Sequence, residues 1–102
     1  MVEYFDMFFD WDENKARSNQ QKHGISFLEA MAVFRDESAV IIDDESHSEE
    51  EQRFIMLGMS EETKLLTVCH CYRGNDEIIR LISARKANRQ EIQKYYSRRQ
   101  TK

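Results

Sequence analysis

Four basic side chains lie in or just beyond stretches that are otherwise apolar, and they are the strongest candidates for chemistry. They are Arg53, His70, Arg80 and Arg85. A guanidinium group matches phosphate oxygens with its fork of N–H donors. An imidazole transfers protons near neutral pH because its ordinary pKa is about 6.5. These residue types therefore suit catalysis at a phosphate ester.

Each of these candidates also has a structural explanation. Arg53 follows an acidic segment and can form a surface ion pair with Glu49 or Glu51. His70 can be a core histidine whose hydrogen bonds are satisfied. An arginine in mid-strand, such as Arg80, needs either solvent or a partner. The sequence leaves both interpretations open.

The tripeptide Cys69-His70-Cys71 resembles a metal-binding motif, but its spacing argues against one. On a strand the two cysteines share one face while the histidine points to the other, and the usual two-residue spacer is missing. We therefore expect no metal, even with His47 as a further ligand, and no other cofactor. The spacing also suits no disulfide, so a reduced, cytoplasmic compartment fits best.

The charge distribution is strongly asymmetric. The net charge is −4, but residues 1–63 carry −11 and residues 64–102 carry +7. Lys86 and Arg89 belong to the basic part and are candidate RNA-binding residues. Such a basic block indicates a polyanion or an acidic partner surface. A membrane is not expected, because no apolar run approaches the ~20 residues that span a bilayer.

Two short helices are predicted near the N-terminus, after a strand that ends at Trp11. Asp12 suits the N-cap of a helix over 13–22, which His23-Gly24 ends with a cation followed by glycine. The capping box Ser26-Phe-Leu-Glu29 then starts a second helix that runs to about residue 34.

The remainder reads as four strands and a final helix. Asn88-x-x-Glu91 caps this helix, with Ile92, Tyr95 and Tyr96 predicted to face inward and residues 98–102 to fray. The order β-α-α-β-β-β-β-α predicts one α+β domain over 1–102, with a helical hairpin and a C-terminal helix on a mainly antiparallel sheet. The predicted strands are 39–42, 54–59, 65–72 and 77–83.

Strand pairing determines which candidates meet. If the turns centre on Glu61-Glu62 and Gly74-Asn75, Arg53 lies opposite His70 and Cys69 lies opposite Arg80. Arg53, His70 and Arg85 then share the parity of the core face but lie toward the strand ends, whereas Arg80 points to the other face. A slip of one residue would exchange these partners. That predicted core face comprises Ile55, Leu57, Leu66, Val68, Ile79 and Leu81.

Several segments of the chain together resemble the BrnT toxin family. The opening segment is Phe9-Asp-Trp-Asp-Glu-Asn-Lys15, and Lys22-His-Gly-Ile-Ser-Phe27 resembles the junction between the helices. His47-Ser48, Glu51 and Arg53 resemble an acidic loop and the strand after it. Ile79-Arg-Leu-Ile-Ser-Ala-Arg-Lys-Ala87 is the most recognisable segment. The resemblance covers residues 9–96.

This resemblance implies a RelE-like fold and a ribonuclease toxin that cleaves RNA and halts translation. It also implies neutralisation by a ribbon-helix-helix antitoxin of the BrnA type, with operator DNA bound only through that complex. RNA cleavage without a metal uses the 2′-hydroxyl as nucleophile, with a base, an acid and cations around the phosphate. The alternatives are a non-catalytic RNA- or protein-binding module that uses the same basic surface, and a degenerate toxin kept as a regulatory subunit.

Overall fold

A mixed sheet forms the centre of the molecule. The computed structural model describes residues 1–43 and 51–100, so His47 and most of the predicted acidic loop lie outside the described residues. The sheet has six strands in the order β1-β2-β6-β5-β4-β3. The strands are β1 (Val2–Tyr4), β2 (Met7–Asp10), β3 (Val40–Asp43), β4 (Phe54–Met59), β5 (Leu65–Arg73) and β6 (Ile78–Lys86).

The strand pairings confirm the predicted α+β class with a mainly antiparallel sheet. Only β2 and β6 pair in parallel among the strands that the structure describes. The strand β1 was not predicted from the sequence, and it forms a hairpin with β2. Phe5 and Asp6 connect these two strands in the left-handed conformation, with φ of 50° and 65°.

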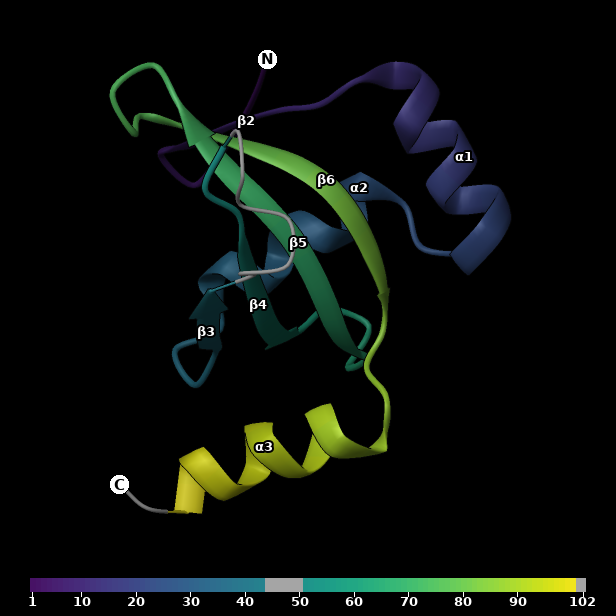
Figure 1. The fold of residues 1–102 in the computed structure, drawn as a ribbon, viewed down its shortest axis with the longest axis vertical. Coiled ribbons are helices and arrows are strands. Elements are labelled where there is room, and N and C mark those ends of the chain that lie inside the picture. Colours follow the sequence, from purple (N-terminus) through teal and green to yellow (C-terminus); the bar gives the residue numbers. More distant parts are fainter. Residues whose placement is uncertain (44–50, 101–102) are drawn as a thin grey trace.

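The helices α1 (Glu13–His23), α2 (Phe27–Ala30), η1 (Met31–Arg35) and α3 (Arg89–Gln100) surround the sheet (Figure 1). The predicted caps are present. The Asp12 side chain accepts hydrogen bonds from the first turn of α1, Gly24 ends that helix at φ 72°, and Ser26 caps α2. The predicted second helix is one α-helical turn that continues as the 3-10 helix η1. No helix in the described residues is long and apolar enough to cross a membrane.

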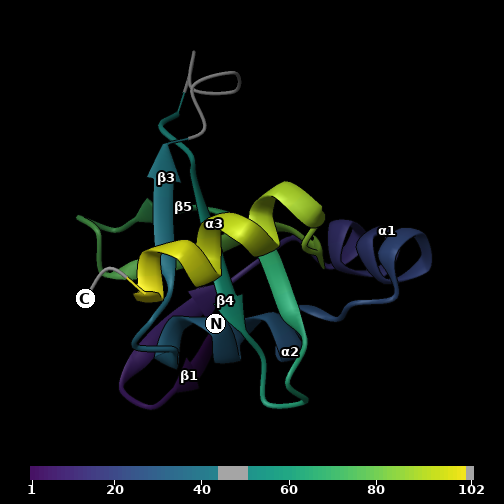
Figure 2. The same ribbon diagram turned by 90° about the horizontal axis from the view of Figure 1, so that it is seen from below.

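Apolar side chains are buried on both faces of the sheet. One face packs against α2 and η1, and its core includes Phe27, Val33, Leu66, Val68 and Leu81. The other face packs against α3, where Tyr95 contacts Val40 and Leu57. Figure 2 shows α3 crossing the sheet in the view from below. The described strands therefore lie between two layers rather than over a single core.

This arrangement corrects the predicted core face and strand register. Phe54 pairs with His70, one residue away from the predicted partner Arg53, because the β4–β5 turn has three residues instead of two. Arg80 pairs with Cys71 instead of Cys69. The parity of β4 relative to β5 is therefore reversed, so Ile55 and Leu57 face α3 while Leu66 and Val68 face α2 and η1.

The C-terminal helix also differs from its prediction. Tyr95 is buried as expected, but Ile92 and Tyr96 are 39% and 42% exposed. The helix reaches Gln100, beyond the predicted start of the frayed tail at residue 98. Tyr95 is the aromatic ring of α3 that packs in the core. Hydrogen bonds of Glu91, in the first turn of α3, to Thr67 and Arg85 also hold the helix against the sheet.

One backbone approach depends on a glycine. A Cβ added to Gly58 of β4 would lie 2.9 Å from the Cβ of Val33 in η1. Real Cβ atoms do not approach this closely, so the absent side chain allows η1 to pack directly on β4. Val33 itself is 0% exposed.

Asn19 of α1 takes the place of a strand at the edge of β6. β2 pairs with β6 only as far as Arg80, which leaves the backbone of Ala84 without a strand partner on that side. The Asn19 side chain donates to the Ala84 carbonyl at 2.8 Å and accepts from the Ala84 N–H at 3.0 Å. It also donates to the carbonyl of Ile25 at 3.0 Å. One amide side chain thus attaches both α1 and the following loop to the sheet.

We predict that Asn19→Ala lowers the free energy of unfolding by roughly 3 kcal/mol, because it leaves buried backbone groups without partners. Gln21→Ala, an exposed substitution on the same helix, serves as the control and should change stability by less than about 0.5 kcal/mol. Urea unfolding measures both variants. Equal stabilities of the two variants would contradict the role assigned to Asn19.

Candidate active site

Arg80 lies at the centre of a row of polar residues that crosses the sheet. Its Cα partners are Cys71 on β5 and Asp10 on β2. The Arg80 Nη1 atom lies 3.4 Å from the Asp10 Oδ1 atom, and both side chains are about one-third exposed, at 30% and 29%. Cys71 follows His70, and Asp10 follows Phe9, and both His70 and Phe9 face α2 and η1. Because side chains alternate along a strand, Cys71, Asp10 and Arg80 point to the opposite face, which α3 partly covers.

Arg53 extends this row on the β4 side. It directly precedes Phe54, which pairs with His70, and continuing the antiparallel register places Arg53 beside Cys71. Side chains opposite each other on neighbouring antiparallel strands have Cβ atoms about 4.5–5.5 Å apart. We call Arg53, Cys71, Arg80 and Asp10 the arginine row. It brings together two of the four predicted catalytic residues.

The thiol in this row is not suited to act as a nucleophile. Cys71 is 0% exposed. Burial raises the pKa of the Cys71 thiol, and the Glu51 carboxylate raises it further, although Arg73 acts in the opposite direction. Glu51 is held by an ion pair with Arg73 at 3.1 Å. The thiol therefore stays protonated, and the arginines carry the positive charge of this surface.

Arg85 lies on the same face but in a different environment. It pairs with Thr67 across the strands and forms a two-pronged interaction with Glu91 of α3, with both N–O distances at 2.9 Å. Glu91 also accepts from the Thr67 hydroxyl at 2.8 Å and from the Asn88 backbone N–H at 2.8 Å. The charge of Arg85 is therefore neutralised by a carboxylate of its own chain.

Glu91 is the anchor of α3 as well as its capping residue. Burial raises the pKa of the Glu91 carboxyl, but hydrogen bonds from Arg85, Asn88 and Thr67 outweigh this effect and leave the pKa below its ordinary value. At the next turn of the helix the Tyr95 hydroxyl donates to Asp36 at 2.5 Å. Asp36 also accepts from the Met59 backbone N–H at 2.9 Å. Two polar contacts thus fasten α3 to the sheet.

The predicted RNA-binding residues lie beside Arg85. Lys86 ends β6, Arg89 begins α3, and both are exposed. Arg80 and Arg85 are five positions apart, which corresponds to about 17 Å along a strand, and the register shift of the β5–β6 ladder at Cys69/His70 leaves both on the same face. On this face the arginine row therefore lies at one end and Arg85 at the other, with Arg89 following at the start of α3, whereas Lys86 pairs with Leu66 and points to the opposite face.

His70 lies on the opposite face from the arginines. Its ring is 0% exposed and sits among aromatic rings, with centroids 4.9 Å from Phe34, 5.9 Å from Phe54 and 5.4 Å from Tyr72. Neither ring nitrogen makes a well-formed hydrogen bond with the described residues. Burial lowers the pKa of His70 to about 4, against a smaller opposing effect of the Val68 backbone. The geometry favours a neutral core histidine over an acid or base.

The sequence did not predict the ion pairs that two carboxylates form with the arginines of this face. Asp10 precedes Trp11 in the segment predicted as a strand, but its pairing with Arg80 depends on the parallel contact between β2 and β6, which no local pattern indicates. Glu91 was predicted as a capping residue, and its bond to Arg85 follows from how α3 folds back on the sheet. In the described part of the chain, no group of three or more His, Cys, Asp or Glu residues is placed to hold a metal ion.

The fold and the arginine-lined face define a small α+β protein suited to bind phosphate groups. The family model for the ribonuclease toxin BrnT of type II toxin–antitoxin systems matches residues 11–91. A crystal structure of the ribonuclease toxin BrnT from Brucella abortus is similar, with a TM-score of 0.62 and 25% sequence identity, over 81% of this chain and 99% of that chain. The comparison with curated proteins yields no match.

The chain belongs to the BrnT family of ribonuclease toxins of type II toxin–antitoxin systems. The match ends at the anchoring residue Glu91, so most of α3 lies beyond the matched segment. The arginine row is matched except for Asp10, which directly precedes it. The resemblance on which the sequence analysis relied is thereby confirmed.

We predict that His70 makes stability depend on pH. Its pKa in the folded state, about 4, lies below the unfolded value of 6.5. Protonation therefore favours unfolding, and stability is lost as the pH falls from 6.5 towards 4. This contribution amounts to roughly 3 kcal/mol. Urea unfolding at several pH values should show this loss in the wild type and a smaller one in His70→Leu.

The same variant tests the alternative that His70 transfers a proton in catalysis. A structural His70 leaves the shape of the pH–rate profile for RNA cleavage unchanged. A profile altered near neutral pH in His70→Leu, with no change in the pH dependence of stability, would contradict the structural role.

We predict that Glu91→Gln loosens α3, because it removes the charge from a carboxylate that accepts four hydrogen bonds. The expected loss of stability is roughly 1–2 kcal/mol, with faster amide hydrogen exchange throughout α3. Glu77→Gln, an exposed carboxylate in the β5–β6 turn, is the control. Unchanged exchange in α3 would show that Tyr95 alone holds the helix.

Proposed function

We propose that this chain is a metal-independent endoribonuclease that cleaves RNA at the arginine row and thereby inhibits translation. The observation that carries the proposal is the placement of Arg53 and Arg80 on either side of Cys71, on the face opposite His70. Membership of a ribonuclease toxin family supports the substrate class. The cytoplasm is the compartment in which such a toxin would meet its substrate.

In the proposed reaction the RNA 2′-oxygen attacks phosphorus and the bond to the 5′-oxygen breaks. The 2′-hydroxyl proton passes to a base, and the departing 5′-oxygen takes up a proton. Negative charge grows on the phosphate oxygens meanwhile, and guanidinium groups already in place stabilise it without reorganisation. Arg80 and Arg53 supply this charge, and Asp10 orients Arg80 from a distance of 3.4 Å.

Asp10 is also our candidate for the base, since its carboxylate belongs to the row and His70 lies on the other face. Arg85 enters the proposal differently. Because Glu91 neutralises it, we assign it to holding α3, with Lys86 and Arg89 contacting the RNA backbone beside it. This division assigns distinct roles to residues that the sequence analysis grouped together.

The proposed partner is a ribbon-helix-helix antitoxin of the BrnA type that covers the basic surface. Membership of a type II toxin–antitoxin family supports the existence of an antitoxin, and operator DNA would be bound only through the complex. A non-catalytic module that holds RNA or an acidic partner on the same surface is the alternative. It predicts RNA binding without cleavage, and expression without growth arrest.

We predict that Arg80→Ala lowers the rate of RNA cleavage by roughly 10²–10³, as expected for the loss of one electrostatic donor. Arg80→Lys should recover only part of the rate because the fork geometry is lost. The measurement is single-turnover cleavage of a defined RNA by purified protein, with chelator present throughout. Arg17→Ala, an exposed arginine on α1, is the control and should cleave at the wild-type rate.

Asp10→Asn separates the two roles of that carboxylate. Loss of a base flattens the acidic limb of the pH–rate profile, whereas loss of orientation lowers the rate at every pH. Full activity of a folded Arg80→Ala variant would place the active site elsewhere on the molecule.

A further inference from the structure

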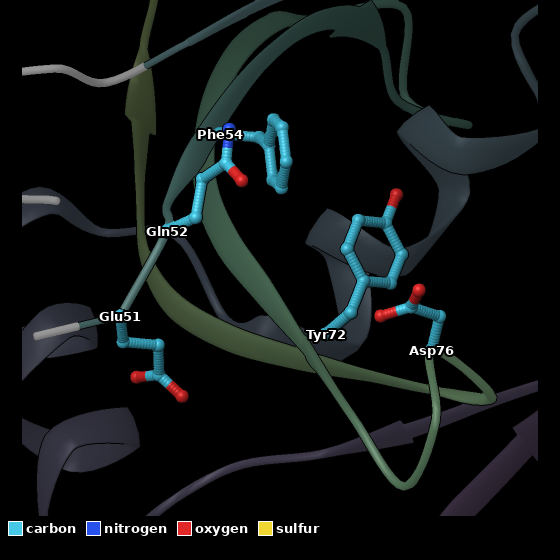
Figure 3. Close-up of a pocket in the computed structure, with 5 residues that line it drawn as sticks. All are labelled: Glu51, Gln52, Phe54, Tyr72 and Asp76. Atoms are coloured by element: carbon cyan, nitrogen blue, oxygen red, sulfur yellow. The ribbon is translucent and has the colours of Figure 1, made fainter.

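A pocket of about 430 Å³ opens on the face opposite the arginine row, at the end of the sheet where the β5–β6 turn lies (Figure 3). Its volume falls within the range of about 300–1,000 Å³ that is typical of sites for small organic groups. The residues that line it are Glu51, Gln52, Phe54, Tyr72 and Asp76.

We propose that this pocket holds a nucleobase of the RNA, next to the phosphate that is cleaved, and that it prefers guanine. The inference rests on the proposed ribonuclease function and adds a determinant of sequence preference to it. Three features carry it: the aromatic walls, the polar groups without partners, and the position of the pocket relative to the arginines.

The walls of the pocket are two aromatic rings in fixed positions. The ring centroids of Phe54 and Tyr72 lie 5.6 Å apart at an angle of 63°. Both rings rest on the buried ring of His70, and both are half-buried. Proteins that read single-stranded RNA stack unpaired bases on such aromatic side chains. Because His70 supports the rings from behind, the stacking surface exists before RNA binds.

The polar groups of the pocket match the Watson–Crick edge of a base. The Asp76 carboxylate, the Gln52 amide and the Tyr72 hydroxyl make no hydrogen bonds to the described residues. In Figure 3 the Asp76 carboxylate lies beside the Tyr72 ring and the Gln52 amide beside the Phe54 ring. A carboxylate accepts from two adjacent donors, and guanine presents two such donors, N1–H and N2–H. The Watson–Crick edges of cytosine, adenine and uracil do not present two different N–H groups side by side to a carboxylate.

The chain segment 51–54 connects the pocket to the arginine row. Alternation places Gln52 and Phe54 in the pocket, whereas Arg53 points to the other face. The Glu51 carboxylate points away from the two rings (Figure 3) and pairs with Arg73 at 3.1 Å. An RNA strand whose phosphate contacts Arg53 would therefore have its neighbouring base within reach of the pocket.

The charge of the pocket favours a base over a phosphate group. The Asp76 carboxylate belongs to the lining, and it repels a phosphate while it accepts hydrogen bonds from a neutral base. A side chain of the antitoxin is the competing occupant. The proximity of Arg53 favours RNA over an antitoxin side chain.

The first measurement is binding of single nucleotides to the purified full-length chain, followed by amide NMR. Guanosine monophosphate should shift the signals of Gln52, Tyr72 and Asp76 at concentrations where uridine monophosphate and inorganic phosphate do not. Asp76→Asn should weaken guanosine monophosphate binding about tenfold. This result does not depend on cleavage, so it tests the pocket even if the proposed ribonuclease activity fails.

Asp6→Asn is the matched control. Asp6 and Asp76 are both exposed turn residues in the left-handed conformation, with φ of 65° and 68°, and asparagine tolerates that conformation. The two substitutions therefore remove the same charge from equivalent turns, and the Asp6 variant should bind guanosine monophosphate like the wild type.

The second measurement is cleavage of RNAs that differ at one position. The wild type should prefer guanine at one position beside the cleaved bond, and Asp76→Asn should lose this preference while it still cleaves the other RNAs. Tyr72→Leu should slow cleavage about 5- to 150-fold through the loss of stacking, and Tyr72→Phe should retain most of the rate.

Cleavage with unchanged base preference in both Asp76→Asn and Tyr72→Leu would overturn the proposal and leave the ribonuclease function standing. NMR shifts in the pocket upon addition of the antitoxin, with none upon addition of any nucleotide, would also overturn it and assign the pocket to the antitoxin.

Discussion

The alternation of side chains along β5 is the constraint on which the rest of the structure depends. His70 and Cys71 are consecutive, both are 0% exposed, and they must point to opposite faces of the sheet. Layers of structure cover both faces, so neither side chain can turn outward. His70 therefore joins the aromatic cluster of Phe34, Phe54 and Tyr72, while Cys71 takes its place between the arginines. A shift of one residue in β5 would exchange these two environments.

The same constraint explains why α3 can act on one group of basic residues without touching the other. The helix packs where Thr67 and Arg85 face outward, several residues along β5 from Cys71. Glu91 neutralises Arg85 there, whereas Arg80 keeps a partly exposed partner in Asp10. An antitoxin that covers the basic surface would therefore contact arginines that differ in how they are paired within the chain. Glu91 already pairs with Arg85 near α3, whereas Arg80 in the arginine row has the partly exposed Asp10 at 3.4 Å.

Capping residues predicted where most helices begin and end, but the sequence predicted poorly which strands pair and in which register. Asp12, Gly24 and Ser26 are caps whose chemistry acts within one helical turn, and all three perform the predicted roles. The capping box of Asn88 and Glu91 is also present. The register failed because Thr63 adopts a left-handed conformation, at φ 60°, which lengthens the turn by one residue. The pairing of Asp10 with Arg80 was beyond reach, since it joins strands that are distant in sequence. The predicted roles of Arg53, His70, Arg80 and Arg85 in catalysis stay predictions.

In the proposed mechanism RNA is cleaved on the arginine face and not on the face of His70. A crystal structure of the chain with an RNA that lacks the 2′-hydroxyl at the cleavage site would test this claim most directly, since such an RNA binds without reacting. We predict that the phosphate at that site accepts hydrogen bonds from Arg80 and Arg53. A phosphate bound on the face of α1, α2 and η1, with Arg80 still paired only to Asp10, would contradict the account.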